Sequence, residues 1–231
     1  MTITFPDPCA TIVTDVGVYA PQHDSLLLAE TLHRSGITEG RRVLDLCTGS
    51  GVLAVAAAQA GAAEVTAFDI CARAVQCARA NASAAGVDVE IRQGSLSDAL
   101  DCQPFDVVVS NPPYVPVTPT SDTESISPVV GPAWAWDAGD DGRLVLDPLC
   151  AAAPELLADG GTMLLVHSEF SGVEESLTAL RSGGLSVDIV QWQWVPFGPV
   201  LSARAEWLES TGRLRAGRRE ELLVVIRADK R

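Results

Sequence analysis

Short apolar runs alternate with helical stretches from residue 41 to the end of the chain. The apolar runs predict strands at 43–46, 65–69, 87–92, 105–110 and 161–167, with two further β segments at 185–195 and 221–227. The intervening stretches predict helices at 52–60, 72–85, 144–157 and 173–181. Because strands and helices alternate, the pattern predicts βαβ units and therefore an α/β fold with a parallel sheet and right-handed crossovers.

Three further segments need separate predictions. Asp24 and Ser25 precede the apolar run 26–28 and predict a capped helix that ends near Gly36. The arginines at 213–219 predict a solvated hairpin loop between the last two β segments. Trp192 and Trp194 alternate on one strand face, which favours packing.

Residues 115–142 follow no regular period. The segment contains four prolines and two tryptophans, namely Pro116, Pro119, Pro128, Pro132, Trp134 and Trp136. A loop of this length inside a compact domain is usually a lid or a binding loop. The tryptophans either cover a pocket or anchor the loop to the core, and the sequence leaves both interpretations open.

Composition narrows the class of protein. Hydrophobic residues make up 47% of the 231 residues, which excludes a disordered chain. Sixteen Lys and Arg against thirty Asp and Glu give a net charge of −14, which argues against a broad nucleic-acid-binding face. The six cysteines form no C-x-x-C pair, so we expect no metal site and a reduced, cytoplasmic protein. We also expect no membrane segment, since no apolar run is long enough.

A glycine-bearing turn joins the first predicted strand to the next helix. In an open parallel sheet ligands bind beyond the carboxyl ends of the strands, and Gly49 and Gly51 would let a ligand approach the backbone. Asp69 ends the following strand, 18 residues after Gly51, where a carboxylate can accept both hydroxyls of a ribose. This spacing fits either a dinucleotide or S-adenosylmethionine.

The segment Asn111-Pro112-Pro113-Tyr114 decides between these ligands. Methylating a planar nitrogen requires that the nitrogen be oriented toward an electrophilic carbon. The Asn111 side-chain carbonyl and the Pro112 main-chain carbonyl can accept its two N–H groups, which is catalysis by positioning. Tyr114 can pack on the flat face of the substrate. The combination predicts a methyltransferase.

Residues 18–114 resemble the class I S-adenosylmethionine-dependent methyltransferases, and Asn-Pro-Pro-Tyr resembles the HemK/PrmC branch, which methylates the glutamine amide of peptide-chain release factors. The segments 18–28 and 133–143 are similar to those of the short eukaryotic and archaeal members. The resemblance implies a Rossmann-like fold, with a seven-stranded, mostly parallel sheet and helices on both faces. No internal repeat, linker or low-complexity segment is evident, so we expect a single domain over 1–231, with an N-terminal extension and helix at 1–40 and the S-adenosylmethionine-binding catalytic core at 41–231.

The resemblance also implies site residues. Asn111, Pro112 and Tyr114 would be catalytic, and no metal is expected. The cofactor would be bound by Ser25, Asp45, Cys47, Thr48, Gly49, Gly51, Asp69, Ile70, Ser95, Leu96 and Asn111. Cys47 stands where the family usually has glycine, and Gly94-Ser95-Leu96 replaces a common acidic position, so the adenine contact is expected from Ser95 or Asp98.

The leading hypothesis is methylation of a protein glutamine side chain in a release factor, and the resemblance implies a small zinc-binding activator subunit as a partner. A small-molecule N-methyltransferase is the first alternative. Adenine N6 methylation poses the same geometric problem, but the acidic chain makes a nucleic-acid substrate a poor fit. A binding module without turnover is the alternative that is not an enzyme.

Overall fold

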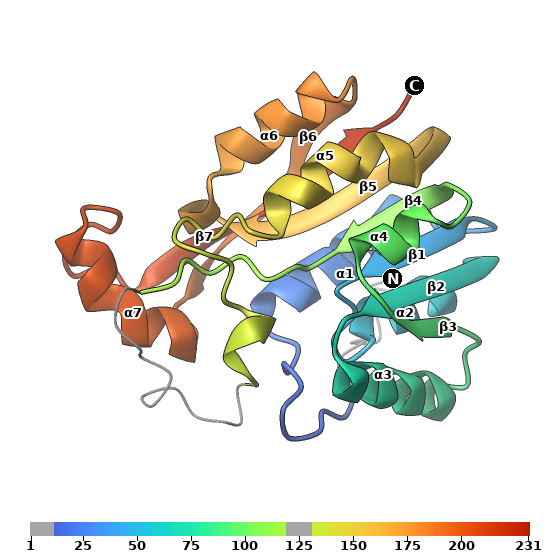
Figure 1. The fold of residues 1–231 in the computed structure, drawn as a ribbon, viewed down its shortest axis with the longest axis horizontal. Coiled ribbons are helices and arrows are strands. Elements are labelled where there is room, and N and C mark those ends of the chain that lie inside the picture. The colour runs from blue at the N-terminus through green and yellow to red at the C-terminus, as the bar shows by residue number, and fades with distance from the viewer. Residues whose placement is uncertain (1–11, 119–130) are drawn as a thin grey trace, which may run out of the picture.

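The computed structural model describes residues 12–118 and 131–231, which form one seven-stranded sheet with the strand order β3-β2-β1-β4-β5-β7-β6 (Figure 1). β7 is antiparallel to both of its neighbours, and the other neighbouring strands are parallel. The predicted fold class is therefore confirmed. The strands are β1 (Arg42–Leu46), β2 (Glu64–Asp69), β3 (Glu90–Gln93), β4 (Phe105–Ser110), β5 (Leu157–Ser168), β6 (Ser186–Pro196) and β7 (Glu220–Asp229).

Helices cover both faces of the sheet (Figure 1). α1 contacts α2, which contacts α3, and on the other face α4 contacts α5, which contacts α6. α7 lies between β6 and β7 in the chain. The helices are α1 (His23–Ser35), α2 (Val52–Gln59), α3 (Ala72–Ala85), α4 (Leu96–Leu100), α5 (Leu146–Leu156), α6 (Val173–Ser182) and α7 (Pro199–Ser210), with short 3₁₀ segments at Ala133–Ala135 and Glu169–Ser171.

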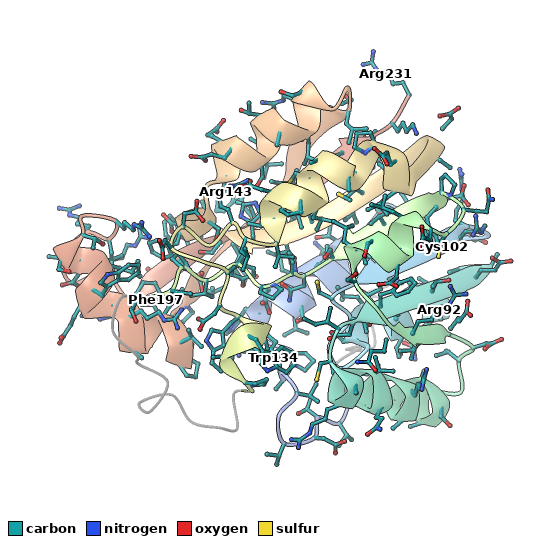
Figure 2. The ribbon with its side chains drawn as sticks, viewed as in Figure 1. Arg92, Cys102, Trp134, Arg143, Phe197 and Arg231 are labelled. Atoms are coloured by element: carbon teal, nitrogen blue, oxygen red, sulfur yellow. The ribbon has the colours of Figure 1, made fainter. Side chains whose placement is uncertain are left out.

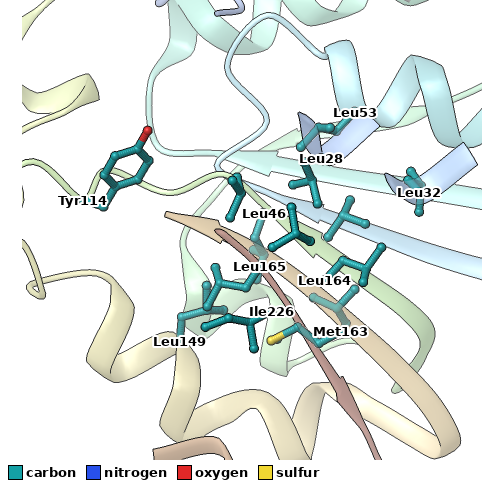
Figure 3. Close-up of a cluster of buried hydrophobic side chains, with 14 of the residues drawn as sticks. Leu28, Leu32, Leu46, Leu53, Tyr114, Leu149, Met163, Leu164, Leu165 and Ile226 are labelled. Atoms are coloured by element: carbon teal, nitrogen blue, oxygen red, sulfur yellow. The ribbon is translucent and has the colours of Figure 1, made fainter. Parts of the chain in front are cut away.

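The core forms because the central strands are apolar on both faces. Met163, Leu164 and Leu165 follow one another on β5 and are all buried, as expected for a strand covered by helices on both sides. Figure 3 shows side chains from several elements in this cluster, including Leu28 of α1 and Ile226 of β7. The packed core holds the carboxyl ends of β1, β2 and β4 in fixed positions.

Several predicted elements differ from the structure. Asp24 and Ser25 lie inside α1, whose N-terminal cap is Gln22, so the predicted cap is wrong. The hairpin predicted between β6 and β7 is also wrong, because α7 occupies 199–210. The helical stripe of α7 is interrupted by a buried arginine, Arg204, which conceals its period. Trp192 and Trp194 are exposed rather than packed, because β6 forms the edge of the sheet.

Candidate active site

A cavity of about 390 Å³ lies at the carboxyl ends of β1, β2 and β4. Parallel strands end at the same edge of a sheet, so residues far apart in the sequence meet there. The structure brings most of the predicted site residues into this lining: Ser25, Cys47, Thr48, Gly49, Asp69, Ile70, Ser95, Leu96 and Asn111. Asp45, Gly51, Pro112 and Tyr114 are not among its lining residues.

Asp45 stabilises the turn after β1 and does not line the cavity. Its Oδ2 accepts hydrogen bonds from Thr48 Oγ1 at 2.6 Å and from the Ala54 main-chain N–H at 3.1 Å. Its Oδ1 is buried without a hydrogen-bond partner among the described residues. Burial raises the pKa of this carboxyl to about 7, although the two hydrogen bonds oppose the shift. Asp45 therefore fixes the turn, and its predicted contact with a cofactor stays a prediction.

Gly51 has a packing role. Its φ of 83° lies in the left-handed region, and an added Cβ would come within 2.9 Å of the Ala78 Cβ on α3. Glycine at this position therefore lets α2 pack closely against α3. Cys47 also adopts a positive φ, of 63°, a conformation that glycine adopts without strain.

Asp69 holds the same turn from the side that faces the cavity. Its Oδ2 accepts the Gly49 N–H and its Oδ1 accepts the Cys71 N–H, each at 2.9 Å. Burial raises the pKa of the carboxyl, while these two hydrogen bonds lower it. A carboxylate has about four lone-pair positions, so two donors leave acceptor capacity for ribose hydroxyls. Apart from the two chain neighbours of Gly49, no atom of the described residues lies within 4 Å of a Cβ placed there, so the backbone is open to a ligand.

The start of α4 forms the side of the cavity where the sequence predicts the adenine contact. Ser95 lines the cavity and forms a capping box with Asp98, whose Oδ2 accepts the Ser95 N–H at 2.7 Å. The two side chains that the sequence offered as an adenine contact therefore have different places. Ser95 faces the cavity, whereas Asp98 caps the helix.

Asn111 is held by a residue of α1. Its Nδ2 donates to Ser25 Oγ at 3.2 Å, and the Ser25 main-chain N–H donates to Asp24 Oδ1 at 2.7 Å. Because the amide nitrogen is turned toward Ser25, the Asn111 Oδ1 is the amide atom available to accept another donor. The amide orientation is thus set by α1.

Tyr114 lies behind the cavity. Its hydroxyl donates to Asp24 Oδ2 at 3.0 Å, and its main-chain carbonyl accepts the Ser171 Oγ–H at 2.6 Å. Pro112 is buried, and Pro113 lines the cavity. Asp24 and Ser25 therefore hold both ends of the Asn-Pro-Pro-Tyr segment, while the predicted contact between Tyr114 and a substrate stays a prediction.

The described ends of the loop 115–142 are joined to each other. The Val115 N–H donates to the Trp136 carbonyl at 2.8 Å, and the Ala138 N–H donates to the Val115 carbonyl at 3.0 Å. Trp134, labelled in Figure 2, lines the cavity and is 46% exposed. Trp136 is 5% exposed and belongs to the core. One tryptophan therefore lies at the pocket and the other anchors the loop. Pro119 and Pro128 lie outside the described residues.

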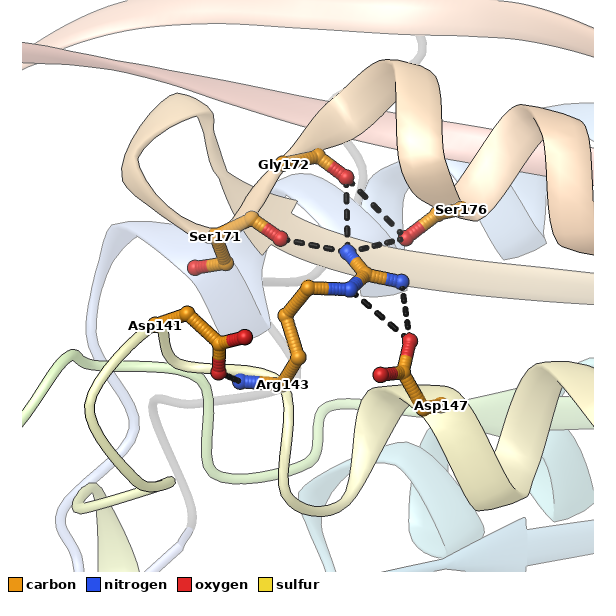
Figure 4. Close-up of polar contacts among 6 residues, drawn as sticks. All are labelled: Asp141, Arg143, Asp147, Ser171, Gly172 and Ser176. Atoms are coloured by element: carbon orange, nitrogen blue, oxygen red, sulfur yellow. Dashed lines mark hydrogen bonds and ion pairs between the residues drawn. The ribbon is translucent and has the colours of Figure 1, made fainter.

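Two buried arginines hold this loop. The Arg204 guanidinium on α7, 1% exposed, pairs with Asp137 at 2.7 Å and donates to the Pro116 carbonyl at 2.8 Å. Arg143 donates to the Ser171 carbonyl and pairs with Asp147 at 2.6 Å (Figure 4). Arg204 therefore ties the loop to α7, and the Arg143–Ser171 hydrogen bond ties the end of the loop to the 3₁₀ segment at Glu169–Ser171.

The comparisons with known proteins agree with this geometry. Residues 10–125 match the family model described as the methyltransferase small domain, which is half of the chain. The chain belongs to the methyltransferase small domain family. Among its relatives is a Methanocaldococcus jannaschii protein provisionally named a protein N5-glutamine methyltransferase, 32% identical over 81% of this chain and 91% of that protein.

A second relative of this methyltransferase is the release factor glutamine methyltransferase of Deinococcus radiodurans, 44% identical over 68% of this chain. The matched region spans 63% of that longer protein. Among solved structures, one chain of the E. cuniculi Mtq2–Trm112 complex has a TM-score of 0.62 at 24% identity, covering 93% of this chain and 99% of that one. This similarity shows the same fold.

The cofactor of this methyltransferase is S-adenosylmethionine, and the cavity fits it. Asp69 has acceptor capacity for the ribose, Gly49 leaves the backbone open, and Ser95 and Leu96 line the expected adenine position. Sequence reasoning did not assign the contributions of Tyr19, Phe68 and Leu149, which also line the cavity. Tyr19 lies in 18–28, a segment singled out only because it resembles family members. Leu149 lies in 144–157, for which the sequence predicted a helix and no site.

The described residues contain no cluster of His, Cys, Asp or Glu able to hold a metal ion. Cys47, Cys71, Cys77, Cys102 and Cys150 are free thiols. Within 12–118 and 131–231, no helix is long and apolar enough to cross a membrane.

Gly142 provides a test of the loop's role. Its φ is 78°, and an added Cβ would overlap the Tyr114 carbonyl oxygen. We expect Gly142→Ala to lower the unfolding free energy of the methyltransferase by about 2–4 kcal/mol, because left-handed strain and backbone overlap add. Gly139→Ala is the matched control. Its φ is 79°, but its nearest neighbour, the Leu144 Cβ, would be 3.5 Å away. Equal urea midpoints for the two variants would contradict the expected contact.

The raised pKa of Asp45 predicts a pH dependence of stability. The folded protein keeps this carboxyl protonated up to about pH 7, whereas its ordinary pKa is 3.8, so its contribution to stability is complete below pH 3.8 and is lost as the pH rises to 7. Asparagine cannot ionise. The unfolding free energy of Asp45→Asn should therefore gain about 4 kcal/mol relative to the native protein between about pH 4 and 8, measured with urea. Exposed Asp88→Asn should show no such gain, and a constant difference for Asp45→Asn would contradict the assignment.

Proposed function

We propose that this methyltransferase transfers a methyl group to the side-chain amide nitrogen of a glutamine in a peptide-chain release factor. The observation that carries the proposal is the fixed orientation of the Asn111 amide, whose nitrogen donates to Ser25. Asn111 lines the same cavity as Asp69, the residue expected to bind the cofactor ribose. The name of the M. jannaschii relative supports a protein glutamine as the acceptor, and the name of the D. radiodurans relative supports a glutamine of a release factor.

The proposed chemistry depends on positioning. S-adenosylmethionine supplies an electrophilic methyl group when bound. An amide nitrogen is a poor nucleophile because its lone pair is delocalised, so its orientation decides the rate. Asn111 Oδ1 accepts one N–H of the acceptor amide, and we assign the Pro112 main-chain carbonyl to the other. Trp134 lines the cavity, where it can exclude water from the reacting groups.

A small activator subunit is part of the proposal. The solved E. cuniculi structure is titled a complex of Mtq2 with Trm112, responsible for methylation of the termination factor eRF1. We propose that this chain also works with a small partner. Zinc binding by that partner, and a cytoplasmic location of the enzyme, stay predictions from the sequence.

Incubation of the purified protein with labelled S-adenosylmethionine and a release factor tests the function. We expect the label on the glutamine of the Gly-Gly-Gln tripeptide, located by mass spectrometry of the digested factor. A release factor in which this glutamine is replaced by alanine is the control and should stay unlabelled. Label that appears only on small amines or amides from a cell extract would favour the small-molecule alternative.

A further inference from the structure

A second hollow, of about 40 Å³, lies beside the active-site cavity. Tyr19 lines both of them. In two pairs of consecutive residues, one member lines the cavity and the other lines the hollow. Ser25 and Pro113 line the cavity, whereas their neighbours Asp24 and Tyr114 line the hollow. The two sites are therefore adjacent, and the Asn-Pro-Pro-Tyr segment runs between them.

The hollow carries two buried carboxyl groups. Asp24, which is buried, accepts hydrogen bonds from Ser25 and from the Tyr114 hydroxyl. Glu221, at the start of β7, is 7% exposed, and its Oε2 has no hydrogen-bond partner among the described residues. The Ser168 side chain hydrogen-bonds to the same carboxyl group. A carboxylate oxygen held out of water without a partner is unfavourable, so this carboxyl either takes up a proton or, once it is ionised, favours a group that supplies a donor.

Among the described residues that line the hollow, acidic side chains outnumber basic ones. Burial, together with the charges of Asp24 and Glu169, raises the pKa of Glu221 to about 7, although Ser168 and Arg218 oppose the shift. Arg218 is itself paired with Glu169 at 2.7 Å. Among the described residues that line the hollow, the only basic side chain is the imidazole of His23.

The hollow opens to solvent and has room for a small polar head. His23, Pro196 and Pro199 line it and are exposed. A volume of about 40 Å³ exceeds the ~10–15 Å³ that one water molecule needs. An ammonium group or the end of a guanidinium is of this size and brings several N–H donors but no acceptor.

We propose that this hollow binds a cationic nitrogen of the methyl acceptor, an ammonium or a guanidinium, with Glu221 as its charged partner. The proposal rests on the proposed function, because it assumes that the acceptor nitrogen enters the neighbouring cavity beside Asn111. In a protein acceptor the cation is a lysine or arginine side chain near the glutamine. In a small acceptor it is the molecule's own ammonium group. The hollow thus selects acceptors that carry a positive charge at a fixed distance from the reacting nitrogen.

Glu221→Gln tests the subsite, because it removes the charge while keeping the shape. With a glutamine peptide that carries a neighbouring arginine, we expect KM to rise about tenfold or more at pH 8 with kcat unchanged, since a charge-assisted hydrogen bond contributes at least ~1.4 kcal/mol. With the same peptide carrying citrulline, KM should be the same for both enzymes. Glu220→Gln changes the adjacent, exposed residue of β7 and should alter neither value. An equal rise of KM for both peptides would overturn the proposal.

The source of the cation is distinguished by a second acceptor series. Free amino acids with an aromatic amine, compared with their N-acetylated forms, replace the peptides in the same assay. If Glu221→Gln raises KM only for the charged peptide, the subsite serves the recognition of a protein acceptor. If Glu221→Gln raises KM only for the free amino acids and not for their N-acetylated forms, the subsite serves a small-molecule acceptor. If KM shows no such difference in either series, the proposal is overturned.

A binding measurement separates this proposal from the proposed function. Methylguanidinium is titrated into the native protein without any acceptor and followed by NMR shifts. We expect saturable shifts that Glu221→Gln abolishes and Glu220→Gln retains. Saturation with no methyl transfer to any release factor would leave the subsite standing and remove the proposed function. A Glu221→Gln protein less stable than the native one at pH 8 would assign Glu221 a structural role and overturn the subsite.

Discussion

Asn111→Ala should lower kcat by about 100- to 1000-fold, the range seen when one positioned polar contact to a reacting group is removed. The physical reason is that alanine has no carbonyl to accept the acceptor's N–H, so the nitrogen is no longer oriented. The affinity for S-adenosylhomocysteine should change little, because Asp69 and the turn after β1 are untouched. Label transfer measures the first quantity and titration calorimetry the second.

Ser25→Ala is the companion to this variant. It removes the hydroxyl that fixes the Asn111 amide and keeps the amide itself. We expect a smaller loss in kcat, about tenfold, since the amide can rotate but still accepts a hydrogen bond. If Asn111→Ala weakened only the binding of S-adenosylhomocysteine and left turnover at saturation unchanged, Asn111 would be a cofactor contact and not the acceptor-orienting residue.

Asp69→Ala should weaken the binding of S-adenosylhomocysteine by about 2–3 kcal/mol, which is a loss of roughly 30- to 150-fold in affinity. The carboxylate is expected to accept the ribose hydroxyls, and it also fixes the Gly49 and Cys71 N–H groups. Both effects act on the donor site, whereas Asn111 lies at the acceptor side. With saturating cofactor, kcat should therefore fall far less than in Asn111→Ala.

Asp88→Ala is the control for this experiment, because it removes an exposed carboxylate just before β3. It keeps the change in net charge the same while leaving the cavity intact. Calorimetric affinity equal to that of the native protein is expected for the control. Native affinity in Asp69→Ala itself would show that the ribose is held by other groups.

Most of the sheet could be predicted because β1, β4 and β7 carry short apolar runs and helical stretches separate most of the strands. β4 and α3 have the predicted boundaries, 105–110 and 72–85. α4 escaped prediction because five residues are too short to show a period. α7 escaped because Arg204 lies in the middle of its buried stripe, and sequence pattern cannot distinguish a buried, paired arginine from an exposed one.

The site was predictable where it depends on turns and strand ends, and less so where it depends on packing between distant segments. The positions of Gly49 and Asp69 follow from strand–turn–helix order. The role of Gly51 depends on Ala78, which lies on another helix. Likewise, a sequence offers no sign that Tyr114 turns away from the cavity to reach Asp24, since that contact spans 90 residues.

The position of β7 has a consequence for biosynthesis. β7 lies between β5 and β6, and it is the strand to which β6 is hydrogen-bonded. While the ribosome is still producing residues before 220, β6 has no partner in the sheet and Glu221 does not yet exist. The nascent chain therefore cannot add β6 to the sheet before β7 has been synthesised. Insertion of β7 between β5 and β6, which is slow because it pairs distant segments, should be the last step of folding.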